Sequence, residues 1–340
     1  MRRTVAAKGL GAGLGAAVLV AVTAVPASAD PAPGVLPAAQ DIVGVGADTT
    51  AALMNRLSAD YNATVSGTAP HLYSWDAAGS LKITPKSGAA EAYRPRGTYA
   101  GLLAQLYDPA AVDFVPAARG PRSGEPLGLL YVAYGKDAVT WSAKAGGHAP
   151  ADLTTQNLFD IYSCFAGKTD WAAFGGTAGT IKPYLPQLGS STRERFLKAI
   201  GSPVLGACVV TGPEENQGTD PVLNDPDVIF PYSVGHWVGQ ADGHTTATDD
   251  RGVLTPRSVN GVAPLTASGT LNPLFANTVH GELIYNVVEG SAWSDPVRGP
   301  QLRAFFGPLG YLCSSAGRAA VVDYGYMTVP PALCGSTSHI

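Results

Sequence analysis

Three short turns bring hydroxyl-bearing residues to the start of a helical pattern. They are Asp48-Thr49-Thr50, which follows Gly46, then Gly97-Thr98-Tyr99, and Gly189-Ser190-Ser191-Thr192 with Arg193 after it. Such a turn can act simply as a helix cap, in which a side-chain oxygen accepts an amide hydrogen bond of the first helical turn. It can also bind an anion, because free amides at a helix N-terminus and nearby hydroxyls donate toward one point. Three such turns in one chain favour the anion.

Alternating strands and helices must position these turns. In an open α/β sheet, ligands bind beyond the carboxyl ends of the strands, where helix N-termini meet. Apolar runs predict strands at 42–46, 71–77, 112–118, 127–135, 138–142, 180–186 and 280–288. Helical spacing of apolar residues predicts helices at 49–62, 99–107, 154–167 and 192–201, and residues 228–240 are expected to form a strand that enters a helix. The two strands at 127–135 and 138–142 are expected to be joined at Gly135-Lys136-Asp137.

The first 29 residues have the pattern of a secretory signal peptide. Arg2, Arg3 and Lys8 precede an apolar run that closes on Ala27-Ser28-Ala29, a small-residue cleavage signal. Cleavage would leave Asp30 as the first residue, and the general and twin-arginine export routes both stay open. No cysteine follows the apolar run to carry a lipid anchor, and no later stretch predicts a membrane span. We therefore expect a secreted protein, in the medium or at the cell wall.

Charge and length narrow the remaining classes. Without the three basic residues of the leader, 19 basic against 26 acidic residues give a net charge of −7. This acidic chain has no electrostatic footprint for nucleic acid. Its length exceeds that of a typical single core and predicts two lobes.

Four cysteines follow the leader: Cys164, Cys208, Cys313 and Cys334. An even count in an exported chain favours disulfides over a metal site. Three pairings are open, and Cys164–Cys208 with Cys313–Cys334 is favoured if each pair lies within one lobe.

Catalytic and metal-binding patterns are weak in this sequence. There is no G-x-S-x-G motif for a serine hydrolase. The six histidines are scattered, and each is expected to be exposed or satisfied locally. Residues 214–227 gather five acidic side chains without calcium-loop spacing, which predicts a solvated acidic loop. We expect neither an enzyme nor a bound cofactor or metal.

Seven ordered segments carry a resemblance to a known family. They are VGVGADTTAALMNRLSADYN, HLYSWDAAG, ITPKSGAAEAYRPRGTYAG, VDFVPAARGP, PQLGSSTRERFL, GPEENQGTD and AAVVDYGYMTVP. Together they resemble the actinobacterial branch of the phosphate-binding, substrate-binding proteins of ABC transporters, over nearly all of 41–330. The resemblance implies the type II periplasmic-binding fold, in which two α/β lobes joined by two crossover segments close on a ligand. Lobe one would comprise 40–132 and 280–340, and lobe two 133–279.

The resemblance also implies a set of ligand-binding residues at the three turns. These are Asp48, Thr49, Thr50, Gly97, Thr98, Tyr99, Gly189, Ser190, Ser191, Thr192 and Arg193, with Arg119 as a further charge partner. This sequence differs from the family pattern at two places. Ser191 replaces a glycine of the family pattern, and Pro116, Ala117 and Ala118 stand where relatives carry arginine and hydroxyl or carboxylate residues. One wall of the site would therefore lack an acceptor for a protonated phosphate.

Three functions follow as hypotheses. The first is a secreted, non-catalytic binding protein for phosphate or a similar small oxyanion, with an ABC permease as the partner that the resemblance leaves open. The second is a relative that has lost its ligand and acts as an extracellular scaffold or interaction protein. The third, a phosphate-releasing hydrolase, would need a metal site that the sequence does not show.

Overall fold

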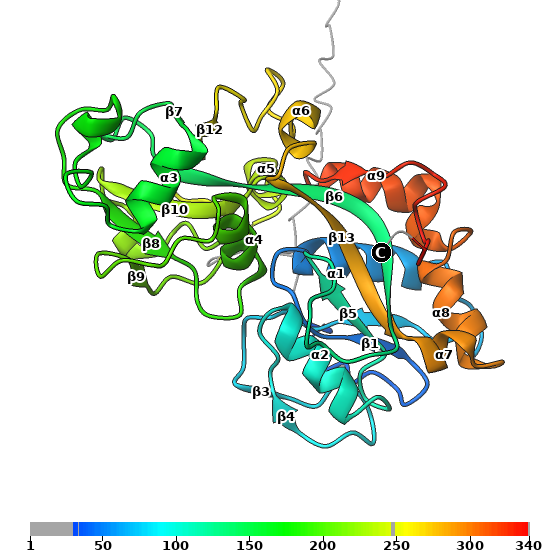
Figure 1. The fold of residues 1–340 in the computed structure, drawn as a ribbon. Helices are drawn as coiled ribbons and strands as arrows, with labels where there is room; N and C mark the ends of the chain where they lie inside the picture. The colour runs from blue at the N-terminus through cyan, green and yellow to red at the C-terminus, as the bar shows by residue number, and fades with distance from the viewer. Residues whose placement is uncertain (1–29, 33, 246–248, 339–340) are drawn as a thin grey trace, which may run out of the picture.

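The computed structural model describes residues 30–32, 34–245 and 249–338, so the predicted signal peptide lies outside the described residues. Two α/β lobes lie side by side, connected by two long strands (Figure 1). This is the fold class that the sequence predicts. We call the two bodies lobe one and lobe two, and define each by its elements below.

Lobe one is built from the two ends of the chain. Its first part holds β1 (Ile42–Gly44), α1 (Ala51–Asn62), β2 (Leu72–Ser74), β3 (Lys82–Ile83), β4 (Ala92–Tyr93), α2 (Thr98–Tyr107) and β5 (Phe114–Ala117). Its second part holds α7 (Gly290–Ser294), α8 (Arg298–Phe306), the 3-10 turn η3 (Tyr311–Cys313), α9 (Ser315–Asp323) and β14 (Met327–Thr328). β1 pairs in parallel with both β2 and β5, as βαβ connections require.

Lobe two is built from the middle of the chain. It holds β7 (Asp152–Leu153), α3 (Thr155–Tyr162), η1 (Trp171–Phe174), β8 (Lys182–Leu185), α4 (Ser191–Ala199), β9 (Val210–Thr211), η2 (Pro221–Leu223), β10 (Val228–Ser233), α5 (Val234–Ala241), β11 (Leu254–Pro256), β12 (Ser258–Val259) and α6 (Pro273–Ala276). β8 pairs in parallel with β9 and β10. Its aromatic core, including Trp141, Trp171 and Phe196, is separate from the core of lobe one.

The two connecting strands are β6 (Leu129–Lys144) and β13 (Gly281–Glu289). They pair antiparallel over most of their length, and β6 continues beyond β13 to pair with β10 in lobe two. The prediction of two strands joined at 135–137 is wrong, because β6 runs through these residues without a break. Gly135 fits close packing within the sheet, since a Cβ there would lie 2.9 Å from Ile284 Cδ1.

Both predicted disulfides are present. Cys164 is bonded to Cys208 in lobe two, and Cys313 to Cys334 in lobe one. The described residues hold no other cysteine. The favoured pairing of sequence neighbours is thus confirmed, with each bridge inside one lobe.

Candidate functional site

The first and third predicted turns converge on the carboxylate of Glu215, a residue of the loop between β9 and η2. Its Oε2 atom accepts hydrogen bonds from Ser190 Oγ at 2.8 Å and from the backbone amide of Thr192 at 3.1 Å. Thr49 Oγ1 donates to the same oxygen at 3.5 Å. Glu215, Ser190 and Thr192 have no exposed surface, and Thr49 has almost none. Donors of both lobes therefore meet on a single anionic oxygen, and we call these four residues the donor cluster.

Local sequence explains how the lobe-two donors are held. Ser190 is the N-cap of α4, and its side chain accepts a hydrogen bond from the Arg193 amide at 3.0 Å while it donates to Glu215. Thr192 lies in the first turn of α4, where backbone amides have no partner within the helix. The partial positive charge at this helix end favours an anion. A helix cap and an anion site thus coexist in one turn.

The second turn closes against the third across the lobe boundary. Thr98 Oγ1 and Ser191 Oγ lie 2.9 Å apart, at the first residues of α2 and α4. Gly97 has φ +89°, and a Cβ there would lie 2.6 Å from the carbonyl oxygen of Gly189. Only glycine permits both that backbone conformation and that approach. Ser191 thus supplies the hydrogen-bonding contact that joins the two turns.

Two buried polar atoms of the donor cluster, Thr192 Oγ1 and Glu215 Oε1, make no hydrogen bond of ordinary geometry among the described residues. The same is true of Thr50 Oγ1, which lies near Tyr134 in lobe one. Thr50 is the N-cap residue of α1, yet its side chain makes no capping bond. Buried polar atoms are nearly always hydrogen-bonded. Thr192 Oγ1 and Glu215 Oε1 therefore add unused hydrogen-bonding capacity to the donor cluster.

Neither predicted arginine directs its guanidinium at the donor cluster. Arg119 is paired with Glu125 and lies 3.3 Å from Glu194. The guanidinium of Arg193 donates to the Pro186 carbonyl at 2.9 Å and to Thr211 Oγ1 at 2.8 Å. Each is held by partners of its own, because a buried guanidinium requires them. The structure thus brings the three turns together without either predicted cation.

Tyr99 and residues 116–118 lie away from the donor cluster. Tyr99 is 46% exposed, which places it on the surface of α2. Ala117 and Ala118 are fully buried in the core clusters of lobe one, and Pro116 lies in β5 opposite Asn286. The apolar replacements in this strand therefore extend the core.

A second group of charged residues lies beside the donor cluster. His236 in α5 faces the Thr49 carbonyl with Nδ1 at 2.7 Å and Asp249 Oδ1 with Nε2 at 2.5 Å. Both partners are acceptors, so both ring nitrogens donate and the imidazole is charged. Burial lowers the pKa of His236, but the carboxylates of Asp249 and Asp48 and the Thr49 carbonyl raise it to about 10. This contact joins α5 of lobe two to the first turn of lobe one.

Two of the three neighbouring carboxyl groups, Asp48 and Glu215, have raised pKa values, and the third, Asp249, has a lowered one. Burial raises the pKa of Asp48 well above its ordinary value, and the charges of Asp249 and Glu215 raise it further. Burial also raises the pKa of Glu215, although hydrogen bonds from Thr192 and Ser190 oppose that shift. Burial would raise the pKa of Asp249 too, yet His236 holds it below its usual range. Carboxylates thus outnumber the one imidazolium in this part of the site.

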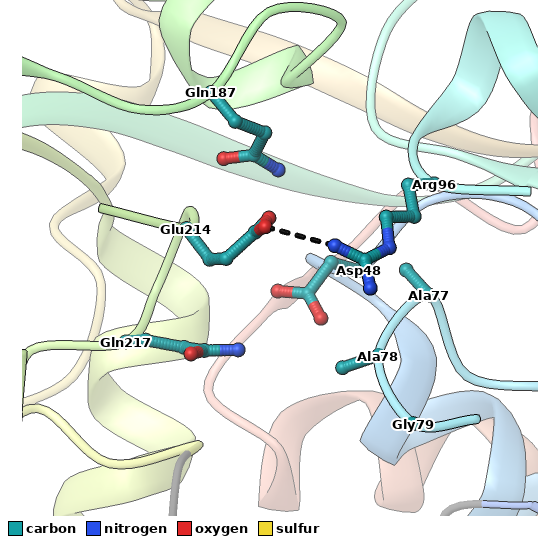
Figure 2. A pocket seen from close by; sticks show the side chains of 8 residues that line it. All are labelled: Asp48, Ala77, Ala78, Gly79, Arg96, Gln187, Glu214 and Gln217. Atoms are coloured by element: carbon teal, nitrogen blue, oxygen red, sulfur yellow. Dashed lines mark hydrogen bonds and ion pairs between the residues drawn. The ribbon is translucent and has the colours of Figure 1, made fainter. Parts of the chain in front are cut away.

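An open cleft of about 350 Å³ adjoins the donor cluster and lies between the lobes (Figure 2). Lobe one contributes Asp48, Arg96 and residues 77–79, and lobe two contributes Gln187, Glu214 and Gln217. Arg96 Nη1 lies 3.1 Å from Glu214 Oε1, so an ion pair spans the cleft. Both side chains are more than a third exposed, and such a pair is worth about 0–1 kcal/mol. The cleft is therefore lined by polar groups, and this ion pair contributes little to holding the two lobes together.

Sequence reasoning missed two residues that the structure places at the centre of the site. Glu215 was expected in a solvated acidic loop, and that expectation is wrong, because its side chain is completely buried. His236 was expected to be exposed or satisfied, and it is buried with both ring nitrogens hydrogen-bonded, but its link to Thr49 across the lobes was not foreseen. No local pattern distinguishes Glu215 from Glu214, and only the long-range packing of the loop does.

The pKa of His236 leads to a prediction about pH. Its folded-state value near 10 lies above the ordinary 6.5, so the charged ring stabilises the fold fully below about pH 6.5. That contribution is lost as the pH rises through 10. In urea unfolding between pH 6.5 and 10, the wild type should lose stability more steeply than His236→Gln. Equal slopes for the two proteins would contradict the charged imidazole.

Within 30–32, 34–245 and 249–338, no group of three or more His, Cys, Asp or Glu side chains is arranged to hold a metal ion. Over the same ranges, no helix has both the length and the apolar character needed to cross a bilayer.

Comparison with known proteins identifies the fold. No protein-family model matches the sequence, and no curated protein matches it. A Clostridium perfringens structure with bound phosphate, assigned as a phosphate ABC transporter substrate-binding protein, aligns with a TM-score of 0.61 and 14% identity over 85% of this chain and 100% of the other. An ABC-type phosphate transport receptor from Vibrio cholerae aligns at 0.58 and 16%, with the same coverage. A phosphate-binding protein from Stenotrophomonas maltophilia aligns at 0.53 and 13%, over 86% and 91%. The chain therefore has the two-lobed α/β fold of these phosphate-binding proteins.

Proposed function

We propose that the protein is a non-catalytic solute-binding protein that captures phosphate or a similar small oxyanion between its lobes. The observation that carries the proposal is the convergence of Thr49, Ser190 and the Thr192 amide on one anionic oxygen. The proposal takes lobe one as 40–132 with 280–340 and lobe two as 133–279. It also includes the actinobacterial branch of the family as the finer relationship.

The donor set suits an oxyanion for a simple chemical reason. A tetrahedral phosphate presents several acceptor oxygens, and the N-terminal turn of α4 offers amides and hydroxyls at a helix end with partial positive charge. Thr192 Oγ1 is buried beside Glu215 and makes no hydrogen bond of ordinary geometry among the described residues. His236 adds a positive charge that lowers the pKa of Glu215. Structures with the same fold carry phosphate in their names, and one of them holds it.

Calorimetric titration with phosphate, arsenate and sulfate tests the proposal. The wild type, beginning at Asp30, should bind phosphate at millimolar concentration or below. Thr192→Ala removes a buried hydroxyl beside Glu215 and keeps the backbone amide that donates to this carboxylate, so the fold should be retained. Phosphate affinity should fall about ten- to a hundredfold, because hydrogen bonds to charged groups are worth about 1.5–3 kcal/mol. Thr192→Ser keeps the hydroxyl and should bind like the wild type.

The second candidate function is that of an extracellular scaffold that binds no anion. Glu215 already satisfies the donors of the cluster, which fits a relative that has lost its ligand and acts as an extracellular scaffold. Failure of the wild type to bind any oxyanion at millimolar concentration would favour the scaffold.

Export and the transporter partner are parts of the same proposal. Two disulfides fit an oxidising compartment, and the leader pattern of residues 1–29 supports secretion. Mass spectrometry of the exported protein should give Asp30 as its N-terminus. An ABC permease is the partner that a solute-binding protein of this fold would serve.

A further inference from the structure

Glu215 stands where an external anion would have to bind. Its Oε2 atom accepts from Ser190, Thr192 and Thr49, and its side chain has no exposed surface. We propose that Glu215 is a built-in competitor for the oxyanion site: its carboxylate holds the donors in the empty protein, and an external anion binds by displacing it. This inference rests on the proposed function and adds the regulation of that same site.

The loop that carries Glu215 is anchored on both sides of this residue. The Glu215 amide donates to Gln187 Oε1 at 2.8 Å. The Asn216 carbonyl accepts from Tyr232 Oη at 2.7 Å and from Gln240 Nε2 at 2.7 Å. These bonds fix the backbone and direct the side chain into the donor cluster. The carboxylate is therefore positioned by the fold, as a bound ligand would be.

An attached carboxylate competes strongly with a free anion. It loses no translational freedom on binding, because the chain already holds it near the donors. The apparent affinity for an external anion falls by the fraction of molecules in which the donors are vacant. Phosphate must therefore bind more weakly to the wild type than to a protein without this carboxylate.

The surrounding charges act in the same direction. The charged groups that act on Glu215 are Asp48 beyond β1 and His236 in α5, and Asp249, in the loop after α5, is hydrogen-bonded to His236. A phosphate dianion that entered beside Glu215 would meet three carboxylates and one imidazolium. Displacement of Glu215 removes one of those negative charges from the site. The adjacent cleft, lined by its neighbours Glu214 and Gln217, offers polar surroundings for the displaced side chain.

Phosphate and formate titrations of three variants test this proposal. Glu215→Ala removes the carboxylate, Glu215→Gln removes only its charge, and Glu91→Ala removes an exposed carboxylate far from the site. Phosphate affinity should rise about ten- to a hundredfold in Glu215→Ala, the range that charged hydrogen bonds support, and less in Glu215→Gln. Glu91→Ala should behave as the wild type. If Glu215→Ala does not fold, Glu215→Gln still reports the affinity change.

Formate separates this inference from the proposed function, because it is a carboxylate small enough for the space that the side chain leaves. It should raise the Tm of Glu215→Ala above that in chloride of equal ionic strength, and leave the wild type unchanged. Formate stabilisation with no phosphate binding in any variant would keep Glu215 as the site's own anion and remove phosphate as the external ligand. Equal phosphate affinity in wild type and both Glu215 variants, without a formate effect, would overturn the inference and leave the proposed function intact.

Discussion

Replacement of Asp137 by alanine should lower the free energy of unfolding by about 3–5 kcal/mol, the usual cost of breaking a buried ion pair. Asp137 lies in β6 and is completely buried, 3.0 Å from Arg195 Nη1 of α4. It also accepts from Ser233 Oγ at 2.8 Å and from the Gly235 amide at 2.8 Å. Its loss leaves the Arg195 charge buried and unpaired. Because α4 and α5 carry the donor cluster and His236, the variant should also disturb the site.

Urea unfolding monitored by circular dichroism measures this effect. Asp60→Ala is the matched control, since Asp60 forms an i,i+4 pair with Arg56 at the surface of α1. Such pairs contribute about 0.3–0.5 kcal/mol. A loss for Asp137→Ala no greater than that of the control would contradict the role given to this carboxylate.

Removal of the Cys164–Cys208 disulfide is the second large effect that we expect. The bridge spans 44 residues of lobe two. A cross-link of this span restricts the unfolded chain and should stabilise the protein by about 3–4 kcal/mol. The double variant Cys164→Ser/Cys208→Ser should therefore unfold at a clearly lower urea concentration than the wild type.

The unreduced wild type, in which both disulfides should be intact, is the reference for that variant. Without a reducing agent, alkylation of the wild type should label none of the four cysteines, and non-reducing peptide maps should show both bridges. An unchanged unfolding midpoint in the double variant would show that the bridge does not restrict the unfolded chain. Alkylation of either cysteine in the unreduced protein would contradict the bond itself.

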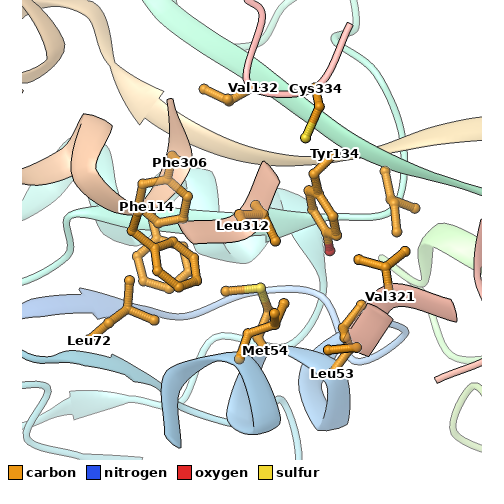
Figure 3. Packing of buried hydrophobic residues seen from close by; sticks show 14 of the residues in the cluster. Leu53, Met54, Leu72, Phe114, Val132, Tyr134, Phe306, Leu312, Val321 and Cys334 are labelled. Atoms are coloured by element: carbon orange, nitrogen blue, oxygen red, sulfur yellow. The ribbon is translucent and has the colours of Figure 1, made fainter. Parts of the chain in front are cut away.

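The helices that follow the turns were predicted from the sequence, because the side chains that a helix buries recur at helical spacing along the chain. Leu53, Met54 and Leu57 recur at helical spacing, and all three are buried in α1. Figure 3 shows Leu53 and Met54 of α1 in one core with Phe114, Tyr134 and Phe306, which come from distant parts of the chain. The helix was readable from sequence, whereas its partners in the core were not.

The sequence predicted a turn at Gly135, and this prediction is wrong because the glycine allows close packing inside a strand. At Gly135 the sequence suggested a turn between two strands, but β6 passes straight through and pairs with β13 and β14. At Gly97 the turn was predicted correctly, and its contact with Gly189 across the lobes emerged only from the fold. A local pattern cannot distinguish a glycine that bends the chain from one that admits a neighbouring strand.

The centre of the site was the least predictable part. The turns were evident because helix N-termini have a local signature. Glu215 reaches them from a loop more than twenty residues beyond α4's start, through contacts that no local spacing encodes. His236 similarly meets Thr49 across 187 residues of sequence. Electrostatic partners from separate lobes are set by tertiary packing, so the sequence alone suggested two arginines that the structure places elsewhere.

A crystal structure of the wild type at saturating phosphate tests the central claim most directly. We expect a tetrahedral anion that accepts hydrogen bonds from Ser190 Oγ, the Thr192 amide and Thr49 Oγ1. The Glu215 carboxylate should have turned away from these donors. A structure in which Glu215 still holds all three donors, with phosphate bound elsewhere or not at all, would contradict the account.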